Sequence, residues 1–278
     1  MAAVPPTHLA CSVRGCGLPL ERRDGTLACL AGHSYDVARS GYVNLLQPQD
    51  RRSPDAGDSR AAIEARARLL AAGVGRALVD AIVGRAASLD LGEHPLVVDL
   101  GSGSGNALAE LAAARPLNAV GIDLSSAAAE HAARRFPALT WVVANADRRL
   151  PFLDRTVNLA LSLHGRRNPE ECARVLAPGG WLLIAVPAHD DLIELRETVQ
   201  GRGIERERAG ALLAAHEPHF TLIDRSEVRD RRRLERDALL DLLRTTYRGE
   251  RTSDAGRVDA ITTLEVTLAS EIFLFRPT

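Results

Sequence analysis

One segment constrains the fold of this chain more than any other: Val97-Val98-Asp99-Leu100-Gly101-Ser102-Gly103-Ser104-Gly105. It ends an apolar strand with an acidic residue and three alternately spaced glycines, which adopt positive φ readily and let the backbone approach a ligand closely. A helix-like stretch follows, and a second short strand then ends in Asp123. This order begins a Rossmann-like βαβ unit, in which the acid after the second strand usually holds ribose hydroxyls. The segment predicts a nucleotide-type cofactor pocket.

The spacing Asp-x-Gly-x-Gly-x-Gly differs from the dinucleotide fingerprint and resembles the first motif of class I S-adenosylmethionine-dependent methyltransferases. S-adenosylmethionine has no phosphate to place on the helix N-terminus, so the glycines need only admit its methionine portion. The resemblance implies that Gly101, Gly103 and Gly105 approach the methionine, that Asp99 organises the loop and that Asp123 binds the ribose. The structural alternatives are a tight turn without ligand and, for Asp123, a helix-capping carboxylate.

The third strand ends in Ala144-Asn145-Ala146-Asp147, where this resemblance places the adenine of the cofactor. Asn145 offers an amide to the exocyclic amine or the ring nitrogens, although a carboxylate is commoner there, and Asp147 is a near alternative. A simple loop role for both residues stays open.

Length and composition exclude several classes of protein. The 278 residues suit a main domain with a smaller appendage, 46% hydrophobic and 26% charged residues are typical of a globular protein, and no apolar run is long enough to cross a bilayer. The N-terminus lacks the basic start and apolar stretch of a signal peptide, so we expect a cytoplasmic protein without membrane contact. The net charge of −1 gives no global attraction to nucleic acid, whereas local arginine clusters permit RNA binding.

Four soft ligands near the N-terminus predict a metal centre. Cys11, Cys16, Cys29 and His33 are separated by four, twelve and three residues, and such spacings suit a tetrahedral structural zinc ion held by two short knuckles. A module this small cannot bury enough apolar surface to fold alone, so the metal would supply much of its folding free energy. Cys172 lies far away in an expected helix and is interpreted as a buried small hydrophobic residue.

The alternation of strands and helices predicts an α/β fold with a mostly parallel, seven-stranded, Rossmann-like sheet. We expect a zinc-binding module at residues 1–46, a linker at 47–58 and the methyltransferase domain at 59–278. Expected strands lie at residues 96–100, 119–123, 140–143, 157–163, 181–186, 219–228 and 263–275, with a turn at 177–180. Expected helices lie at residues 61–70, 75–89, 107–115, 127–135, 170–176, 192–216 and 234–243. Asp58 or Ser59 is expected to cap the first helix.

The run that follows the last metal ligand is long and distinctive: His33-Ser34-Tyr35-Asp36-Val37-Ala38-Arg39-Ser40-Gly41-Tyr42-Val43-Asn44-Leu45-Leu46. It resembles the ribosomal large-subunit RNA (guanine-N1) methyltransferases, whose zinc module ends in such a segment and is followed by an element matched here by Gly57-Asp58-Ser59. The resemblance implies methyl transfer to N1 of a guanine in a hairpin of 23S ribosomal RNA. Whether the protein forms a homodimer stays open.

Three departures from that family are visible, and two of them lie in substrate-facing regions. The first two cysteines are separated by four residues rather than two. An Ala-Pro segment after the fourth strand is replaced by His164-Gly165-Arg166, and a Thr-Pro segment followed by Trp is replaced by the stretch ending in Tyr247-Arg248. The target nucleotide is therefore less firmly implied than methyl transfer.

Methyl transfer from a sulfonium is a one-step displacement, in which the enzyme contributes chiefly by positioning. If the acceptor is guanine N1, its proton must leave, and an acceptor with a pKa near neutrality would help. His164, where the fourth strand opens on the acceptor side, is the candidate, with a structural or substrate-contacting role as the alternative. Asn168 is expected to shape the acceptor pocket. Arg166 and Arg167 are candidates for a phosphate contact.

Two other functions fit the same residues. The altered regions around His164 and Tyr247 would suit a small-molecule acceptor with the same fold and donor. A protein that binds S-adenosylmethionine without turnover is the other alternative, although intact Asp99, glycines and Asp123 argue against degeneration.

Overall fold

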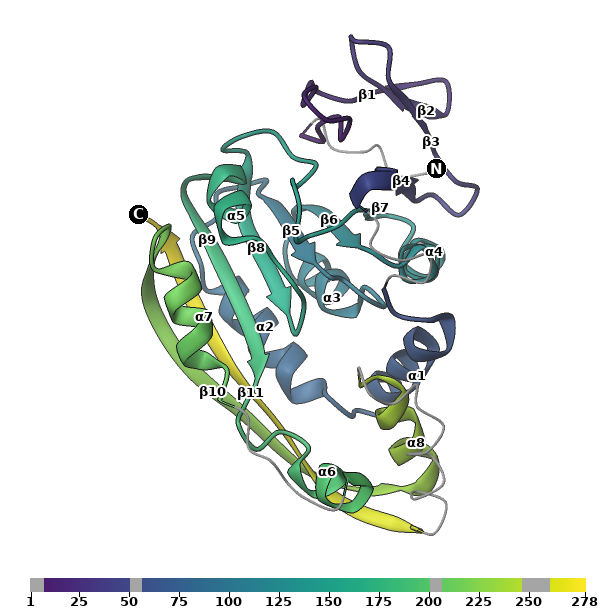
Figure 1. Ribbon diagram of the computed structural model, residues 1–278, viewed down its shortest axis with the longest axis vertical. Helices are drawn as coiled ribbons and strands as arrows, with labels where there is room; N and C mark the ends of the chain where they lie inside the picture. Colours follow the sequence, from purple (N-terminus) through teal and green to yellow (C-terminus); the bar gives the residue numbers. More distant parts are fainter. Residues whose placement is uncertain (1–7, 51–56, 201–206, 247–260) are drawn as a thin grey trace.

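A mixed eight-stranded sheet forms the centre of the computed structural model, which describes residues 8–50, 57–200, 207–246 and 261–278 (Figure 1). The strand order is β10-β11-β9-β8-β5-β6-β7-β4. The strands are β4 (Val43–Asn44), β5 (Leu96–Leu100), β6 (Asn118–Asp123), β7 (Thr140–Val143), β8 (Val157–Leu163), β9 (Leu176–Pro187), β10 (Phe220–Glu235) and β11 (Thr263–Pro277). Neighbours from β4 to β9 are parallel, and the β10–β11 hairpin joins β9 antiparallel.

Alternate residues of the central strands pack into two apolar layers, because successive side chains of a strand point to opposite faces. Val97 and Leu183 pack against α2 (Arg76–Ala87), α3 (Asn106–Ala114) and α4 (Ser126–Arg135). Val98 and Leu182 belong to the opposite layer, which includes residues of α5 (Pro169–Val175) and α7 (Ala209–His216). Burial on both faces explains why these strands are almost continuously apolar.

A third apolar cluster lies at the far end of the long hairpin and forms a separate lobe. It joins α1 (Arg60–Ala71), α6 (Ile193–Gln200) and α8 (Arg236–Arg244) to the ends of β10 and β11 (Figure 1). Arg68 donates two hydrogen bonds of 2.8 Å to Asp241, which ties α1 to α8. The helix α6 follows the carboxyl end of β9, and its Glu194 accepts hydrogen bonds from Thr267 of β11, so the lobe adjoins this end of the sheet.

The N-terminal module consists of the antiparallel strands β1 (Glu21–Arg23), β2 (Thr26–Ala28) and β3 (Ser34–Asp36), followed by β4 and a short 3-10 helix, η1 (Pro48–Asp50). Its strand β4 pairs in parallel with β7. The amide of Leu45 donates to the carbonyl of Val143 (3.0 Å), and that of Ala10 donates to Pro151 (2.9 Å). The module is thus hydrogen-bonded to the sheet edge that carries the loop after β7.

The expected fold class is confirmed, with differences in several elements. The sheet has eight strands rather than seven, because β4 extends it. The expected helix at 192–216 is two helices, α6 and α7, and β10 continues to Glu235 rather than ending at residue 228 because it pairs with β11 along its length. The expected turn at 177–180 lies inside β9, where Gly179 has φ 75° and the pairing with β8 is irregular.

Two further observations complete the fold. Ser59, one of the two expected caps, accepts a hydrogen bond from the amide of Ala62 at the start of α1. Tyr247 and Arg248, on which one departure from the family rests, lie outside the described residues. In the part of the chain that the structure describes, every helix is too short or too polar to cross a membrane.

Candidate active site and metal centre

The glycine loop joins β5 to α3, and Gly101, Gly103 and Gly105 have φ values of 81°, 53° and 79°. A β-carbon on Gly105 would lie 2.4 Å from the ring of Trp141, so packing as well as backbone conformation requires glycine there. A β-carbon on Gly103 would lie 3.0 Å from the guanidinium of Arg66. Gly105 therefore has a structural role that the sequence pattern alone did not reveal.

Two carboxylates lie at the ends of neighbouring strands beside this loop. Asp123 accepts hydrogen bonds from the amides of Gly103 (2.9 Å) and Ser125 (2.8 Å). Asp99 is buried, and its Oδ1 has no hydrogen-bond partner among the described residues. Burial, with a contribution from Asp123, raises the pKa of Asp99 to about 7, and burial also raises the pKa of Asp123. An orphaned buried oxygen beside a second carboxylate fits a cationic ligand, because a positive charge relieves both penalties.

The raised pKa of Asp99 predicts a pH-dependent stability for the protein without cofactor. In the unfolded chain the carboxyl ionises near its ordinary value, so its contribution to stability is present below that value and is lost as pH rises through about 7. We expect Asp99→Asn to gain stability relative to the wild type between pH 6 and pH 8. Urea unfolding of both proteins at the two pH values measures this, and an equal pH dependence would contradict the assignment.

The segment Gly57-Asp58-Ser59 lies against Ser125, which follows β6 and caps the start of α4. The hydroxyl of Ser125 donates to the carbonyl of Asp58 (2.7 Å), and a β-carbon on Gly57 would lie 2.7 Å from the amide of Ser125. Asp58 also forms an ion pair of 3.0 Å with Arg66. The sequence predicts this segment as a family feature and as a helix cap, and in the structure its Asp58 also pairs with Arg66 beside the glycine loop.

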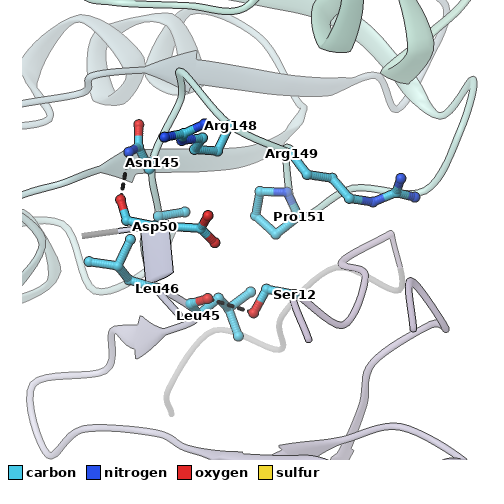
Figure 2. Close-up of a pocket in the computed structure, with 9 residues that line it drawn as sticks. Ser12, Leu45, Leu46, Asp50, Asn145, Arg148, Arg149 and Pro151 are labelled. Atoms are coloured by element: carbon cyan, nitrogen blue, oxygen red, sulfur yellow. Dashed lines mark hydrogen bonds between the residues drawn. The ribbon is translucent and has the colours of Figure 1, made fainter. Parts of the chain in front are cut away.

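The loop after β7 is tied to the N-terminal module. Asn145 donates from its side-chain amide to the carbonyl of Asp50 (2.9 Å) and accepts from the amide of Asp147 (2.9 Å), while Asp147 forms an ion pair of 3.2 Å with Arg166. Figure 2 shows the cavity between these parts, which Ser12 also lines. Its volume of about 20 Å³ holds a water molecule rather than an adenine ring. This cavity therefore lies in the interface between the zinc module and the methyltransferase domain.

His164 lies at the end of β8 with φ 54°, and its amide donates to the carbonyl of Ala185 (2.9 Å). Its Nε2 lies 2.9 Å from the hydroxyl of Ser270 on β11. His164 keeps part of its surface open to solvent, but the protein atoms around the ring desolvate it, and this desolvation, with the charges of Arg66 and Arg208, lowers its pKa to about 4. His164 is therefore neutral at pH 7 and only weakly basic.

Gly165 allows the loop after β8 to approach β5. A β-carbon there would lie 2.6 Å from the carbonyl oxygen of Leu100, so Gly165→Ala is expected to destabilise the fold by about 1–3 kcal/mol through forced backbone displacement. Gly84→Ala in α2 is the control, since a β-carbon there meets nothing within 4 Å and should stabilise the helix by about 0.5–1 kcal/mol. Urea unfolding compares the two. Equal stability of Gly165→Ala and the wild type would contradict the tight contact.

The remaining acceptor-side residues have structural partners. Asn168 caps α5 by accepting hydrogen bonds from the amides of Glu170 (3.1 Å) and Glu171 (3.4 Å). Arg167 donates to the carbonyl of Gly165 (2.9 Å) and lies 3.4 Å from Nε2 of the buried His216. A role of Asn168 in the acceptor pocket stays a prediction. Because both capping bonds use Oδ1, the side-chain nitrogen is the atom that remains for that role.

The four predicted metal ligands come together. The ligand atoms of Cys11, Cys16, Cys29 and His33 all lie within 4.8 Å of one another, and the sulfurs of Cys16 and Cys29 are 3.9 Å apart. A tetrahedral zinc ion with Zn–S bonds of about 2.3 Å separates two thiolates by roughly 3.8 Å, so the arrangement fits zinc. Cys172 is buried in the main core, as expected for a small hydrophobic residue.

Comparisons with known proteins match both the sheet domain that carries the glycine loop and the N-terminal module that carries the metal ligands. A methyltransferase domain model matches residues 97–180, and a model described as "RlmA, N-terminal" matches residues 10–54. The 23S rRNA (guanine(748)-N(1))-methyltransferase of Streptomyces fradiae is 36% identical, over 81% of this chain and 80% of its own. A Micromonospora griseorubida protein named provisionally as a 23S rRNA (guanine-N(1)-)-methyltransferase is 35% identical over 97% of each chain. A solved complex of the Haloferax volcanii Trm112 methyltransferase activator with a protein named provisionally as a methyltransferase matches with a TM-score of 0.52 and 21% identity, over 78% of this chain and 97% of the matched chain.

The fold, the glycine loop and the methyltransferase model define a class I S-adenosylmethionine-dependent methyltransferase. S-adenosylmethionine is its methyl donor, and its N-terminal module is a structural zinc ribbon. The chain belongs to the family of 23S rRNA (guanine-N1)-methyltransferases.

Proposed function

We propose that this protein methylates N1 of a guanine in a hairpin of 23S ribosomal RNA. The observation that carries the proposal is the similarity to 23S rRNA (guanine-N1)-methyltransferases, since the Micromonospora griseorubida relative aligns over 97% of each chain and so includes both the zinc module and the methyltransferase domain. A small-molecule acceptor and a non-catalytic binding protein are not favoured by these relatives. The cytoplasm, where ribosomal RNA is available in bacteria such as these relatives, is the corresponding location.

In this proposal the donor lies across the glycine loop at the carboxyl ends of β5 and β6. Gly101 and Gly103 admit the methionine portion, Gly105 holds the loop against Trp141, and the ribose hydroxyls bind the carboxylate of Asp123. The unpaired Oδ1 of Asp99 binds a positively charged group of the ligand, or accepts a hydrogen bond from a water molecule that the ligand orders. Because the carboxyl groups of Asp99 and Asp123 lie close together, the site favours the cationic donor over the neutral product.

In the loop after β7, Asn145 and Asp147 border the adenine. Asn145 has one side-chain N–H left after its bond to Asp50, which suffices for one hydrogen bond to a ring nitrogen. Asp147 keeps a carboxylate oxygen for the exocyclic amine while it pairs with Arg166. The adenine site and the zinc module therefore share the loop after β7.

On the acceptor side, His164 lies at the end of β8 and contacts the flipped base, held in orientation by Ser270. Unstacked RNA bases are read best on their hydrogen-bonding edges, which a side chain at a strand end can reach. Cys11, Cys16, Cys29 and His33 hold the zinc ion, and the ribbon presents its arginines to the RNA backbone.

The proposal is tested with the purified, zinc-loaded protein, labelled S-adenosylmethionine and a transcript of the 23S rRNA region that contains the target hairpin. We expect label in one nucleoside, which digestion and mass spectrometry identify as N1-methylguanosine. Label on another atom or nucleoside, or transfer to small molecules of a cell extract with none to RNA, would overturn the proposal.

A further inference from the structure

A cluster of titratable groups lies where the carboxyl ends of β8 and β9 meet the middle of β11. His164, which follows β8, is 2.9 Å from the hydroxyl of Ser270, and Asp191, which follows β9, accepts a hydrogen bond of 2.9 Å from the amide of Ala269. Two side chains from different loops thus bind consecutive residues of one strand. In open α/β sheets, ligands bind outside the carboxyl ends of the strands.

The carboxylate of Asp191 takes a position that a further β9 residue would occupy. The amide of Ala188 donates to the carbonyl of Ala269, and the Asp191 side chain accepts from the amide of the same residue. Among the described residues, this is the one hydrogen bond that the Asp191 side chain makes, and it occupies Oδ1. The second oxygen is left for a ligand, while the first fixes the orientation of the group.

Charged groups surround this carboxylate. Arg208 donates to the carbonyl of Pro187 (3.1 Å), and Arg196 donates to the backbone carbonyl of Asp191 itself (2.6 Å). Burial raises the pKa of Asp191 to about 6, with Asp190 adding to the rise and the Ala269 amide, Arg196 and Arg208 opposing it. Asp191 is therefore ionised at pH 7 but a stronger base than an ordinary carboxylate.

We propose that Asp191 is the catalytic base that removes the N1 proton of the target guanine. This inference rests on the proposed function and identifies the group that makes the acceptor nucleophilic. The N1–H bond breaks, its proton goes to the free oxygen of Asp191, and the N1 electron pair forms the new bond to the methyl carbon. The carbon–sulfur bond breaks with its electron pair left on sulfur, so the positive charge of the donor and the negative charge of the carboxylate disappear together.

The chemistry of the guanine edge favours a carboxylate over an imidazole. N1–H and the neighbouring amino group are adjacent donors, and the free oxygen of an ionised carboxylate has two lone pairs with which to accept from both. His164 already shares its Nε2 with Ser270, and its pKa of about 4 makes it the weaker base. His164 then acts by contacting and positioning the base while Asp191 takes the proton.

The test uses Asp191→Asn, which keeps the acceptor for the Ala269 amide but removes the charge and the basicity. Asp80→Asn is the control, because that carboxylate pairs with Arg76 on the surface of α2. With the full-length zinc-loaded enzyme and the 23S rRNA hairpin, kcat of Asp191→Asn is expected to fall about 100-fold, with KM for the donor little changed. Asp80→Asn should stay within about twofold of the wild type.

The pH profile separates catalysis from structure. Because alkali removes the N1 proton without enzyme, the deficit of Asp191→Asn should shrink as pH rises, whereas a purely structural defect would be the same at each pH. If Asp191→Asn fails to fold, Asp191→Glu serves instead and should keep a reduced rate that falls when its carboxyl is protonated. A kcat near the wild-type value, or a loss independent of pH, would overturn the inference alone. A wild-type enzyme that leaves guanine N1 unmethylated would overturn the proposed function and this inference together.

Discussion

Removing zinc is expected to unfold the N-terminal module while the central sheet stays folded. The strands β1, β2 and β3 have three residues each, and most of these residues are exposed or half-buried. The metal therefore takes the place of a hydrophobic core within the module. Structural zinc contributes about 10–16 kcal/mol in isolated zinc-finger peptides, which exceeds what a module of this size gains from burial. Hydrogen exchange of chelated protein should show loss of amide protection in residues 8–50 and retention in β5 to β9.

The same loss should reach the donor site. Ser12, next to Cys11, donates to the carbonyl of Leu45 (2.5 Å), and Leu45 follows the strand that pairs with β7. Unfolding the module therefore frees the loop that carries Asn145, and donor affinity should fall with zinc content.

Cys29→Ser tests this without a chelator, and Cys172→Ala is the control. Cys29→Ser should purify without zinc and bind the donor more weakly, while Cys172→Ala should retain one zinc ion because Cys172 is in the main core. A zinc-free protein with full protection in residues 8–50 would contradict this account of the module.

Asp123→Ala is expected to weaken S-adenosylmethionine binding by about 10- to 100-fold. The carboxylate orders the loop through the amides of Gly103 and Ser125, and in our proposal it accepts the ribose hydroxyls. A hydrogen bond to a charged group contributes about 1.5–3 kcal/mol, and about 1.4 kcal/mol corresponds to a tenfold change in affinity. Isothermal titration calorimetry with the purified protein measures the change.

Asp80→Ala is the matched control for that experiment. Asp80 is an exposed carboxylate of α2 that pairs with Arg76, and its removal should leave donor affinity unchanged. Unaltered affinity in Asp123→Ala would show that the donor does not use this carboxylate.

Much of the fold was predictable because the relevant signals are local. The Asp99-to-Gly105 segment and the alternation of apolar strands with alanine-rich helices predicted β5 to β8 and the helices between them to within about a residue. The metal ligands were predictable because their chemistry restricts their spacing, and the structure brings all four together. Both signals lie in short stretches of chain.

The parts that were not predictable depend on contacts between distant segments. Pairing with β11 extends β10 to Glu235, and pairing with β7 brings β4 into the main sheet; neither strand has a strong pattern of its own. The packing of Gly105 on Trp141 and the position of Asp191 beside the strand that holds Ser270 likewise appear only in three dimensions. An acidic residue after a strand is too common in sequences to single out Asp191.

The most direct test of the account is to map N1-methylguanine in 23S rRNA from a strain that lacks this gene. An N1 methyl group blocks base pairing, so reverse transcriptase stops at the modified position. The account predicts one stop in wild-type RNA that disappears on deletion, returns fully with the wild-type gene and returns more weakly with Asp123→Ala. An unchanged set of stops in the deletion strain would contradict it.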